Sequence, residues 1–90
     1  MNSEEFYRLA KVVGLDKYNI SDSKESRGMA NVIGITEDNG CWVVFEADEK
    51  ATFHALSKHE SQEDAYNALF KELRDRKRRE KIIKKLRKLR

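Results

Sequence analysis

The sequence has one cysteine, no proline and only four glycines among its 90 residues. Because Cys41 has no second cysteine to pair with, an intramolecular disulfide is excluded and a reducing compartment is the natural setting. No apolar run approaches the roughly 18 residues that span a bilayer, and the N-terminal stretch lacks the apolar core of a secretory signal. We therefore expect a soluble, cytoplasmic protein.

Motifs for catalysis or metal binding are also scarce. Four side chains suit a metal, but none has C-x-x-C or H-x-x-x-H spacing: Cys41, Asp48, His54 and His59. A carboxylate pair for acid–base chemistry would need a pocket that a domain of this size can hardly enclose. We expect a binding module that is not an enzyme and that uses no metal or cofactor.

Charge divides the chain into two parts. Residues 1–70 carry seven Lys or Arg and thirteen Asp or Glu, whereas residues 71–90 carry twelve Lys or Arg and three acids. The formal net charge of +3 hides this contrast. An acidic body and a basic tail are expected to meet different surroundings.

The N-terminal stretch predicts a helix over residues 3–13. Ser3 can cap it, two acids suit the positive end of its dipole, and one stripe is apolar: Phe6, Leu9, Ala10 and Val13. Gly14 followed by Leu15 fits a left-handed helix stop with an apolar contact.

Residues 30–47 contain the strongest local pattern, two β-rich runs joined by Asn39 and Gly40. This pair is preferred in two-residue hairpin turns, where both residues need positive φ. The turn fixes a register in which the Phe45 ring covers the missing side chain of Gly34. One face then holds Ile33, Ile35, Trp42 and Val44 with Glu37 and Glu46, and the other holds Val32, Thr36, Cys41, Val43 and Phe45. Because both faces are largely apolar, a second covering surface or a partner is implied.

Other segments complete the predicted sheet. The run "TFHALS" predicts a third antiparallel strand, whose register the preceding turn leaves open. Tyr18 and Ile20 can add a short fourth strand, and the rest of residues 16–28 is either a flexible connection or a binding loop. We predict an α+β fold with an N-terminal helix, a three-stranded or four-stranded antiparallel sheet, and a long C-terminal helix packed on one face.

The last helix is predicted to start at Ser61, which stands at capping-box spacing from Asp64. Its apolar stripe comprises Ala65, Tyr66, Leu69, Phe70 and Leu73. Since no Pro or Gly follows, the helix is expected to run to the end over about 43 Å, which exceeds the width of a small domain. We therefore divide the chain into one domain, residues 1–73, and a basic helical extension, residues 74–90.

Apolar residues of that extension point away from the body. At 100° per residue they centre about 180° from the preceding stripe: Ile82, Ile83, Leu86 and Leu89. Either the helix breaks near residues 74–80, or this patch contacts a second copy, another partner or, although it has no Trp or Phe anchor, a membrane surface. A solvated helix end is the simplest alternative. Candidate phosphate contacts of a nucleic acid are Arg76, Lys77, Arg78 and Arg79, although no aromatics are interleaved for stacking.

Acidic residues of the body offer a second candidate surface. An exposed tryptophan beside carboxylates is a common interface anchor, and complementary charge speeds association with a basic partner. The predicted partner-binding residues are Glu37, Asp38, Trp42, Glu46, Asp48 and Glu49. The alternative is that these acids are ordinary solvated turn residues.

The run "CWVVFEADEKA", followed by "SQEDAYNALFKEL", resembles small α+β bacterial immunity proteins of polymorphic toxin systems. The resemblance covers residues 30–73 and rests on Trp42, Phe45, Glu46, Ser61, Glu63 and Ala65. The chain departs from that pattern in its basic tail and at "ADEKA", where an Arg-Gly pair often stands. The resemblance implies stoichiometric neutralisation, in which the acidic body covers the active site or substrate groove of a cognate toxin.

Two other functions remain open. A small nucleic-acid-binding or ribosome-associated accessory protein would act through residues 71–90. A dimerising adaptor would instead use the last helix.

Overall fold

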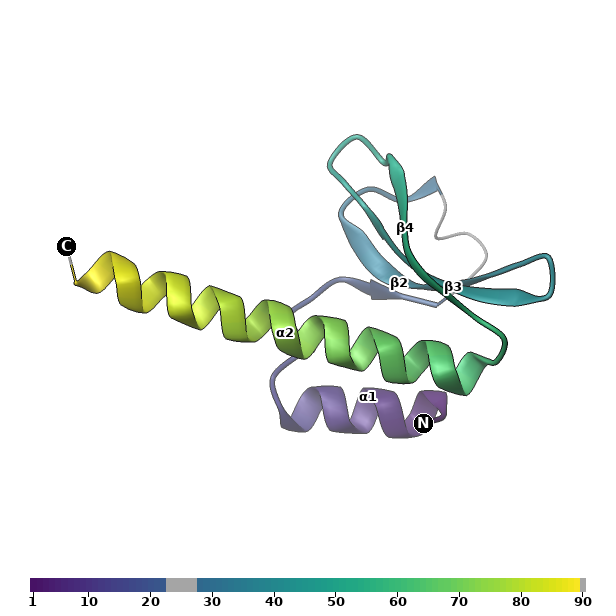
Figure 1. Ribbon diagram of the computed structural model, residues 1–90, viewed down its shortest axis with the longest axis horizontal. Coiled ribbons are helices and arrows are strands. Elements are labelled where there is room, and N and C mark those ends of the chain that lie inside the picture. Colours follow the sequence, from purple (N-terminus) through teal and green to yellow (C-terminus); the bar gives the residue numbers. More distant parts are fainter. Residues whose placement is uncertain (23–27, 90) are drawn as a thin grey trace.

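The computed structural model describes residues 1–22 and 28–89 and has the α+β fold that the sequence predicts (Figure 1). Most of the predicted polar loop, residues 23–27, lies outside the described residues. The elements in chain order are α1 (Ser3–Val12), β1 (Ile20–Ser21), β2 (Val32–Asp38), β3 (Cys41–Ala47), β4 (Phe53–His59) and α2 (Gln62–Lys88).

Local signals define both ends of α1. Asn2, rather than the predicted Ser3, is the N-cap, because its side chain accepts a hydrogen bond from the Glu5 amide at 2.8 Å. The two neighbours are both good capping residues, so sequence alone does not separate them. At the other end Gly14 has a φ of 76°, and the amide of Leu15 donates to the Ala10 carbonyl, as expected for a left-handed stop.

The sheet has the order β1-β2-β3-β4 and is mixed. The predicted hairpin register between β2 and β3 is confirmed in every pair, and β4 adds antiparallel to β3 with a bulge. The prediction of a wholly antiparallel sheet was wrong, because β1 pairs parallel to β2. A parallel pair needs a long crossover, and the segment between Ser21 and Val32 supplies that length.

The two faces of the sheet have separate cores. Side chains of α1 and α2 pack on the face that carries Ile33, Ile35 and Val44. The opposite face has its own buried cluster, Val32, Val43, Phe45 and Ala47, against which Phe53 packs. The second apolar face is therefore mostly buried within the chain itself.

Gly34 lies opposite Phe45, as predicted, but the ring is not what occupies the space beside it. The Phe45 ring stacks on Phe53, with centroids 5.0 Å apart. A Cβ on Gly34 would instead overlap the carbonyl oxygen of Ser21. Glycine is required here because the backbone of β1 approaches that of β2 too closely for a side chain.

Helix α2 is continuous over its 27 residues and has no break between residues 74 and 80. Ser61 caps it by accepting from the Asp64 amide, as predicted. The first half docks through the buried residues Ala65, Tyr66, Leu69 and Leu73. At about 1.5 Å per residue the helix measures roughly 40 Å, so its second half projects from the body (Figure 1).

Candidate binding surfaces

Trp42 lies at the end of the sheet where β2 turns into β3. The register places it between Glu37 on β2 and His59 on β4. The tryptophan is half-buried and packs against the helix-side core, whereas Glu37 is exposed. Because β4 ends at His59 and α2 begins at Gln62, the start of α2 lies at this end too.

Both helices begin at this same end (Figure 1). The ring of Phe6 in α1 lies 5.1 Å from that of Tyr66 in α2, and farther along Val13 lies beside Lys77, so the helices run in the same direction. Acids in their first turns also complement the helix dipoles. We call this part of the molecule the acidic end; its carboxylates are Glu4, Glu5, Glu37, Asp38, Glu60, Glu63 and Asp64.

Three of the predicted partner-binding acids lie elsewhere. Asp48 and Glu49 are in the turn after β3, about 20 Å from the acidic end, given roughly 3.4 Å per strand residue. Hydrogen bonds from the amides of Thr52 and Lys50 to Asp48 lower the pKa of that carboxyl. Glu46 points toward the helices. The predicted set thus divides between the two ends of β3.

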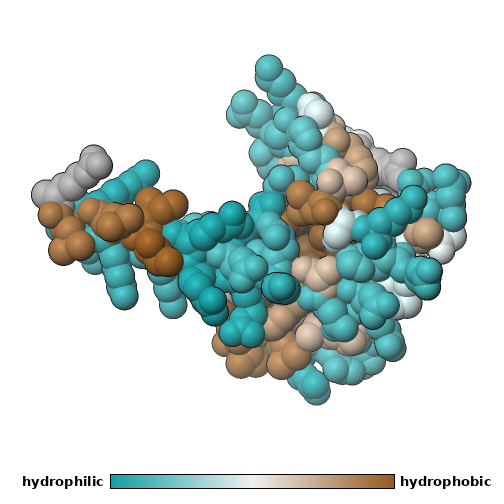
Figure 2. All heavy atoms as spheres, in the orientation of Figure 1, coloured by the Kyte–Doolittle hydropathy of each residue, from teal (hydrophilic) through white to brown (hydrophobic). Residues whose placement is uncertain are grey.

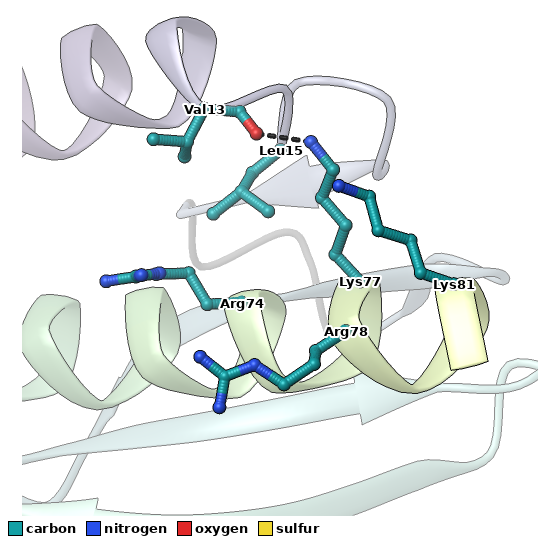
Figure 3. A pocket seen from close by; sticks show the side chains of 6 residues that line it. All are labelled: Val13, Leu15, Arg74, Lys77, Arg78 and Lys81. Carbon is teal, nitrogen blue, oxygen red and sulfur yellow. Dashed lines mark hydrogen bonds between the residues drawn. The ribbon is translucent and has the colours of Figure 1, made fainter.

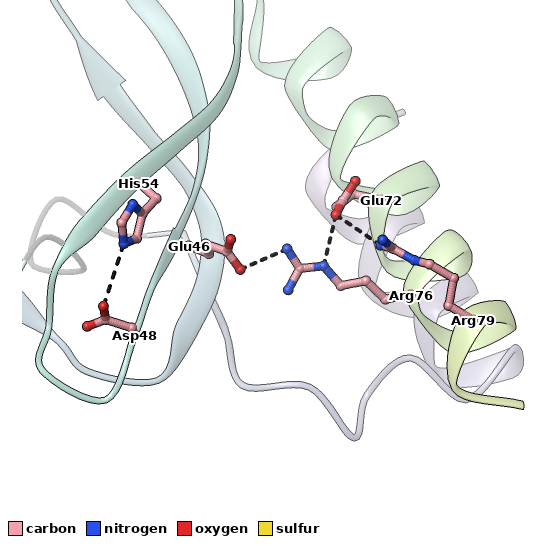
Figure 4. A network of polar contacts seen from close by, with 6 residues as sticks. All are labelled: Glu46, Asp48, His54, Glu72, Arg76 and Arg79. Atoms are coloured by element: carbon pink, nitrogen blue, oxygen red, sulfur yellow. Dashed lines mark hydrogen bonds and ion pairs between the residues drawn. The ribbon is translucent and has the colours of Figure 1, made fainter. Parts of the chain in front are cut away.

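Glu46 belongs to a network that joins the sheet to α2 (Figure 4). Arg76 donates to Glu46 at 2.8 Å and to Glu72 at 2.9 Å. Arg79 lies 3.7 Å from the same Glu72 carboxylate. These contacts hold the helix against the sheet, so Glu46 and Arg76 are positioned for packing rather than for an outside partner.

A second set of polar contacts anchors α2 to the segment after α1. The ammonium of Lys77 donates to the carbonyl oxygen of Val13 (Figure 3). Glu80 accepts from Lys17 at 2.5 Å and from the Tyr18 hydroxyl at 3.2 Å. Beyond Leu73, its last buried leucine, α2 therefore still contacts the body through polar side chains.

Sequence reasoning missed these anchors, although their spacing held a signal. Lys77 and Glu80 are four and seven residues after Leu73, which places both within about 40° of the buried stripe. A polar residue that points in the direction of the buried stripe is a candidate for contact with the body, even within a highly charged segment.

Asp22 ties the end of β1 to both helices. Its carboxylate accepts from the Tyr7 hydroxyl of α1 at 3.1 Å and from the Tyr66 hydroxyl of α2 at 3.0 Å. Burial, together with the negative charge of Asp22, raises the pKa of Tyr7 to about 12 and raises the pKa of Tyr66 as well. Each tyrosine hydroxyl thus has a hydrogen-bond acceptor, and the shared carboxylate links β1 to both helices.

The far part of α2 carries an isolated apolar patch, separated from the apolar residues of the body by hydrophilic surface (Figure 2). Its residues are 49–83% exposed: Ile82, Ile83, Leu86 and Leu89. The predicted direction of this patch, away from the core, agrees with these exposures. We call it the apolar tail patch.

The predicted phosphate-contacting residues have different environments. Arg76 and Lys77 are engaged with the body, and Arg79 lies beside Glu72. Arg78 is exposed and lines a hollow of about 230 Å³ next to the end of α1 (Figure 3). Of the four, only Arg78 is fully available to an external anion within the part of the chain that the structure describes.

Other candidate chemistry finds no assembled site. Cys41 is half-buried beside the hairpin turn, and His54 approaches Asp48 at 3.5 Å. Across residues 1–22 and 28–89, no three His, Cys, Asp or Glu side chains come together as metal ligands would. None of the helices in these ranges combines the length and apolar composition that a bilayer crossing requires.

Comparisons of this chain with protein-family models, with curated proteins and with solved structures find no match.

Proposed function

We propose that this chain is a non-catalytic protein-binding module whose acidic end binds a basic surface of another protein. One observation carries the proposal: three separate segments, residues 4–5, 37–38 and 60–64, bring carboxylates to the end of the molecule at which the half-buried Trp42 lies. Such a surface combines an aromatic anchor with charge that steers a basic partner and increases its association rate.

A cytoplasmic immunity role is the most specific form of this proposal. The resemblance of residues 30–73 to immunity proteins supports it, and so does the charge of the acidic end, which suits a toxin domain with a basic groove for nucleic acid. Neutralisation would be stoichiometric, because the bound module covers the groove. Three of the six predicted contact residues lie at the acidic end: Glu37, Asp38 and Trp42.

Co-expression tests the proposal. The probe is the C-terminal toxin domain of a secreted protein encoded beside this gene, and the readouts are copurification and protection of cells. Glu37→Lys with Glu60→Lys should abolish both. The matched control, Asp16→Lys with Glu49→Lys, changes the net charge equally at exposed positions away from the acidic end and should preserve both. Equal loss in the two variants, or no complex with the wild type, would overturn the proposal.

The apolar tail patch favours a second candidate function, that of a self-associating adaptor. We expect a second copy of the chain to bind this patch, because the basic tail of one chain is complementary in charge to the acidic end of another. Light scattering should then show association at low salt that Ile82→Glu with Leu86→Glu removes. A wild type that is monomeric at every salt concentration would exclude this candidate.

A further inference from the structure

A regular series of cations follows one side of α2. Their separations alternate between four and three residues, which is the spacing that aligns side chains along a helix: Arg74, Arg78, Lys81, Lys85 and Lys88. All five are exposed. From first to last they span about 21 Å, given 1.5 Å per residue. We call this series the basic stripe.

Carboxylates are kept off the basic stripe. Glu72 faces Arg76 and Arg79, and Glu80 faces Lys17 on the docked side of the helix. Asp75 lines a hollow together with Arg74 and Arg78, yet it forms no ion pair with either among the described residues. The stripe is therefore a line of charge that the rest of the molecule leaves largely uncompensated.

The body adds a concave surface to the first half of the stripe (Figure 3). Val13 and Leu15, at the end of α1, form one wall of a hollow whose other wall is Arg74, Lys77, Arg78 and Lys81. Since Lys77 is held by the Val13 carbonyl, it fixes the edge of the hollow. Arg74 lies over the Phe70 ring, 5.8 Å from its centroid, and Arg78 and Lys81 are left to face a ligand.

We infer that the basic stripe binds the phosphate backbone of a nucleic acid duplex, which goes beyond the proposed function and does not depend on it. A strand of B-form DNA has a phosphate about every 3.4 Å along its axis, so 21 Å of stripe spans about six phosphates. A straight row of five cations can neutralise those phosphates of both strands that the duplex turns toward the helix. Aromatic side chains, on which unpaired bases would stack, are absent from the stripe, so a paired backbone is the better fit.

A membrane surface fits the stripe less well. A helix that lies on a bilayer buries an apolar side along the whole contact. The apolar tail patch lies beside only the second half of the stripe. Beside the first half, at Arg74 and Arg78, the same side of the helix carries the acidic residue Asp75. The series of cations thus continues beyond the length that lipid could contact.

Fluorescence anisotropy with a short labelled DNA duplex of mixed sequence tests the inference. The stripe variant is Arg78→Gln, Lys81→Gln and Lys85→Gln, and the control is Arg8→Gln, Lys11→Gln and Lys50→Gln, which removes the same charge from exposed sites elsewhere. With five phosphate contacts, the logarithm of the wild-type binding constant should fall with that of salt at a slope of about −4.5. The stripe variant should bring this slope to about −2, and the control should leave it unchanged.

Three outcomes would overturn the inference. The first is no duplex binding at about 50 mM salt, and the second is an equal effect of the two triple variants, which would assign binding to net charge alone. The third is that the wild type does not bind the duplex but binds phosphatidylserine vesicles, and that Ile82→Ser with Leu86→Ser removes this vesicle binding. Because Glu37→Lys with Glu60→Lys leaves the stripe intact, that variant should keep the wild-type salt slope, and this separates the stripe from the acidic end.

Discussion

The guanidinium of Arg76 on α2 donates a hydrogen bond to the carboxylate of Glu46 on β3, at 2.8 Å. A second bond from the same guanidinium reaches Glu72, one turn earlier on the helix. Arg76 lies just beyond Leu73, the last buried apolar residue of α2. A half-buried charge network therefore takes over from the core as the link between helix and sheet.

Removal of this link should weaken the fold. In Arg76→Ala the carboxylates of Glu46 and Glu72 lose their shared partner, and we expect the free energy of unfolding to fall by about 1 kcal/mol, since the side chains are partly exposed and screened. Urea unfolding measures the change. Arg79→Ala is the control, because its 3.7 Å contact is longer and more exposed; a larger loss in the control would contradict the assignment.

The close approach of β1 to β2 should make position 34 intolerant of a side chain. Gly34→Ala places a methyl group where the Ser21 carbonyl oxygen lies, so the strands must separate. We expect a loss of about 2 kcal/mol in the free energy of unfolding, as for other overpacked sites. Gly28→Ala is the matched control, because a Cβ there meets no atom within 4 Å. Equal thermal stability of the two variants would show that the β1 contact does not constrain Gly34.

The tyrosines that share Asp22 predict an alkaline dependence of stability. Burial and the charge of Asp22 raise the pKa of Tyr7 to about 12, from an ordinary value near 10. A raised pKa means that the folded state holds the phenolic proton more tightly. The corresponding stability is complete below about pH 10 and is lost as the pH rises toward 12. Phenolate absorbance should show late titration that Tyr7→Phe reduces; a normal titration of every tyrosine would refute the Asp22 contacts.

Several structural features were accessible from the sequence because local chemistry determines them. Asn39 and Gly40 specify the hairpin turn and hence the register, and Gly14 specifies the end of α1. The parallel pairing of β1 was not accessible, because a two-residue strand that a long connection separates from β2 leaves no periodic pattern. It depends on a crossover that no local signal describes.

The candidate surfaces were predictable only in part. Glu46 and Asp48 are close to Trp42 in sequence, but an extended strand separates its two ends by about 20 Å. Conversely, Glu4 and Glu63 are distant in sequence but lie at the same end of the molecule, because α1 and α2 run in the same direction. Charge counted along the chain therefore identified the acidic body but not the acidic end.

The apolar tail patch should contribute little to the folding of α2. Ile82 and Leu86 are 52% and 58% exposed, so Ile82→Ser with Leu86→Ser should leave the free energy of unfolding within about 0.5 kcal/mol of the wild type. Leu73→Ala, in the buried stripe of the same helix, should instead cost about 2–5 kcal/mol. Urea unfolding of both variants provides the comparison. If the double variant lost as much stability as Leu73→Ala, the apolar tail patch would have to pack on its own domain, and its role as a surface for a second copy would fail.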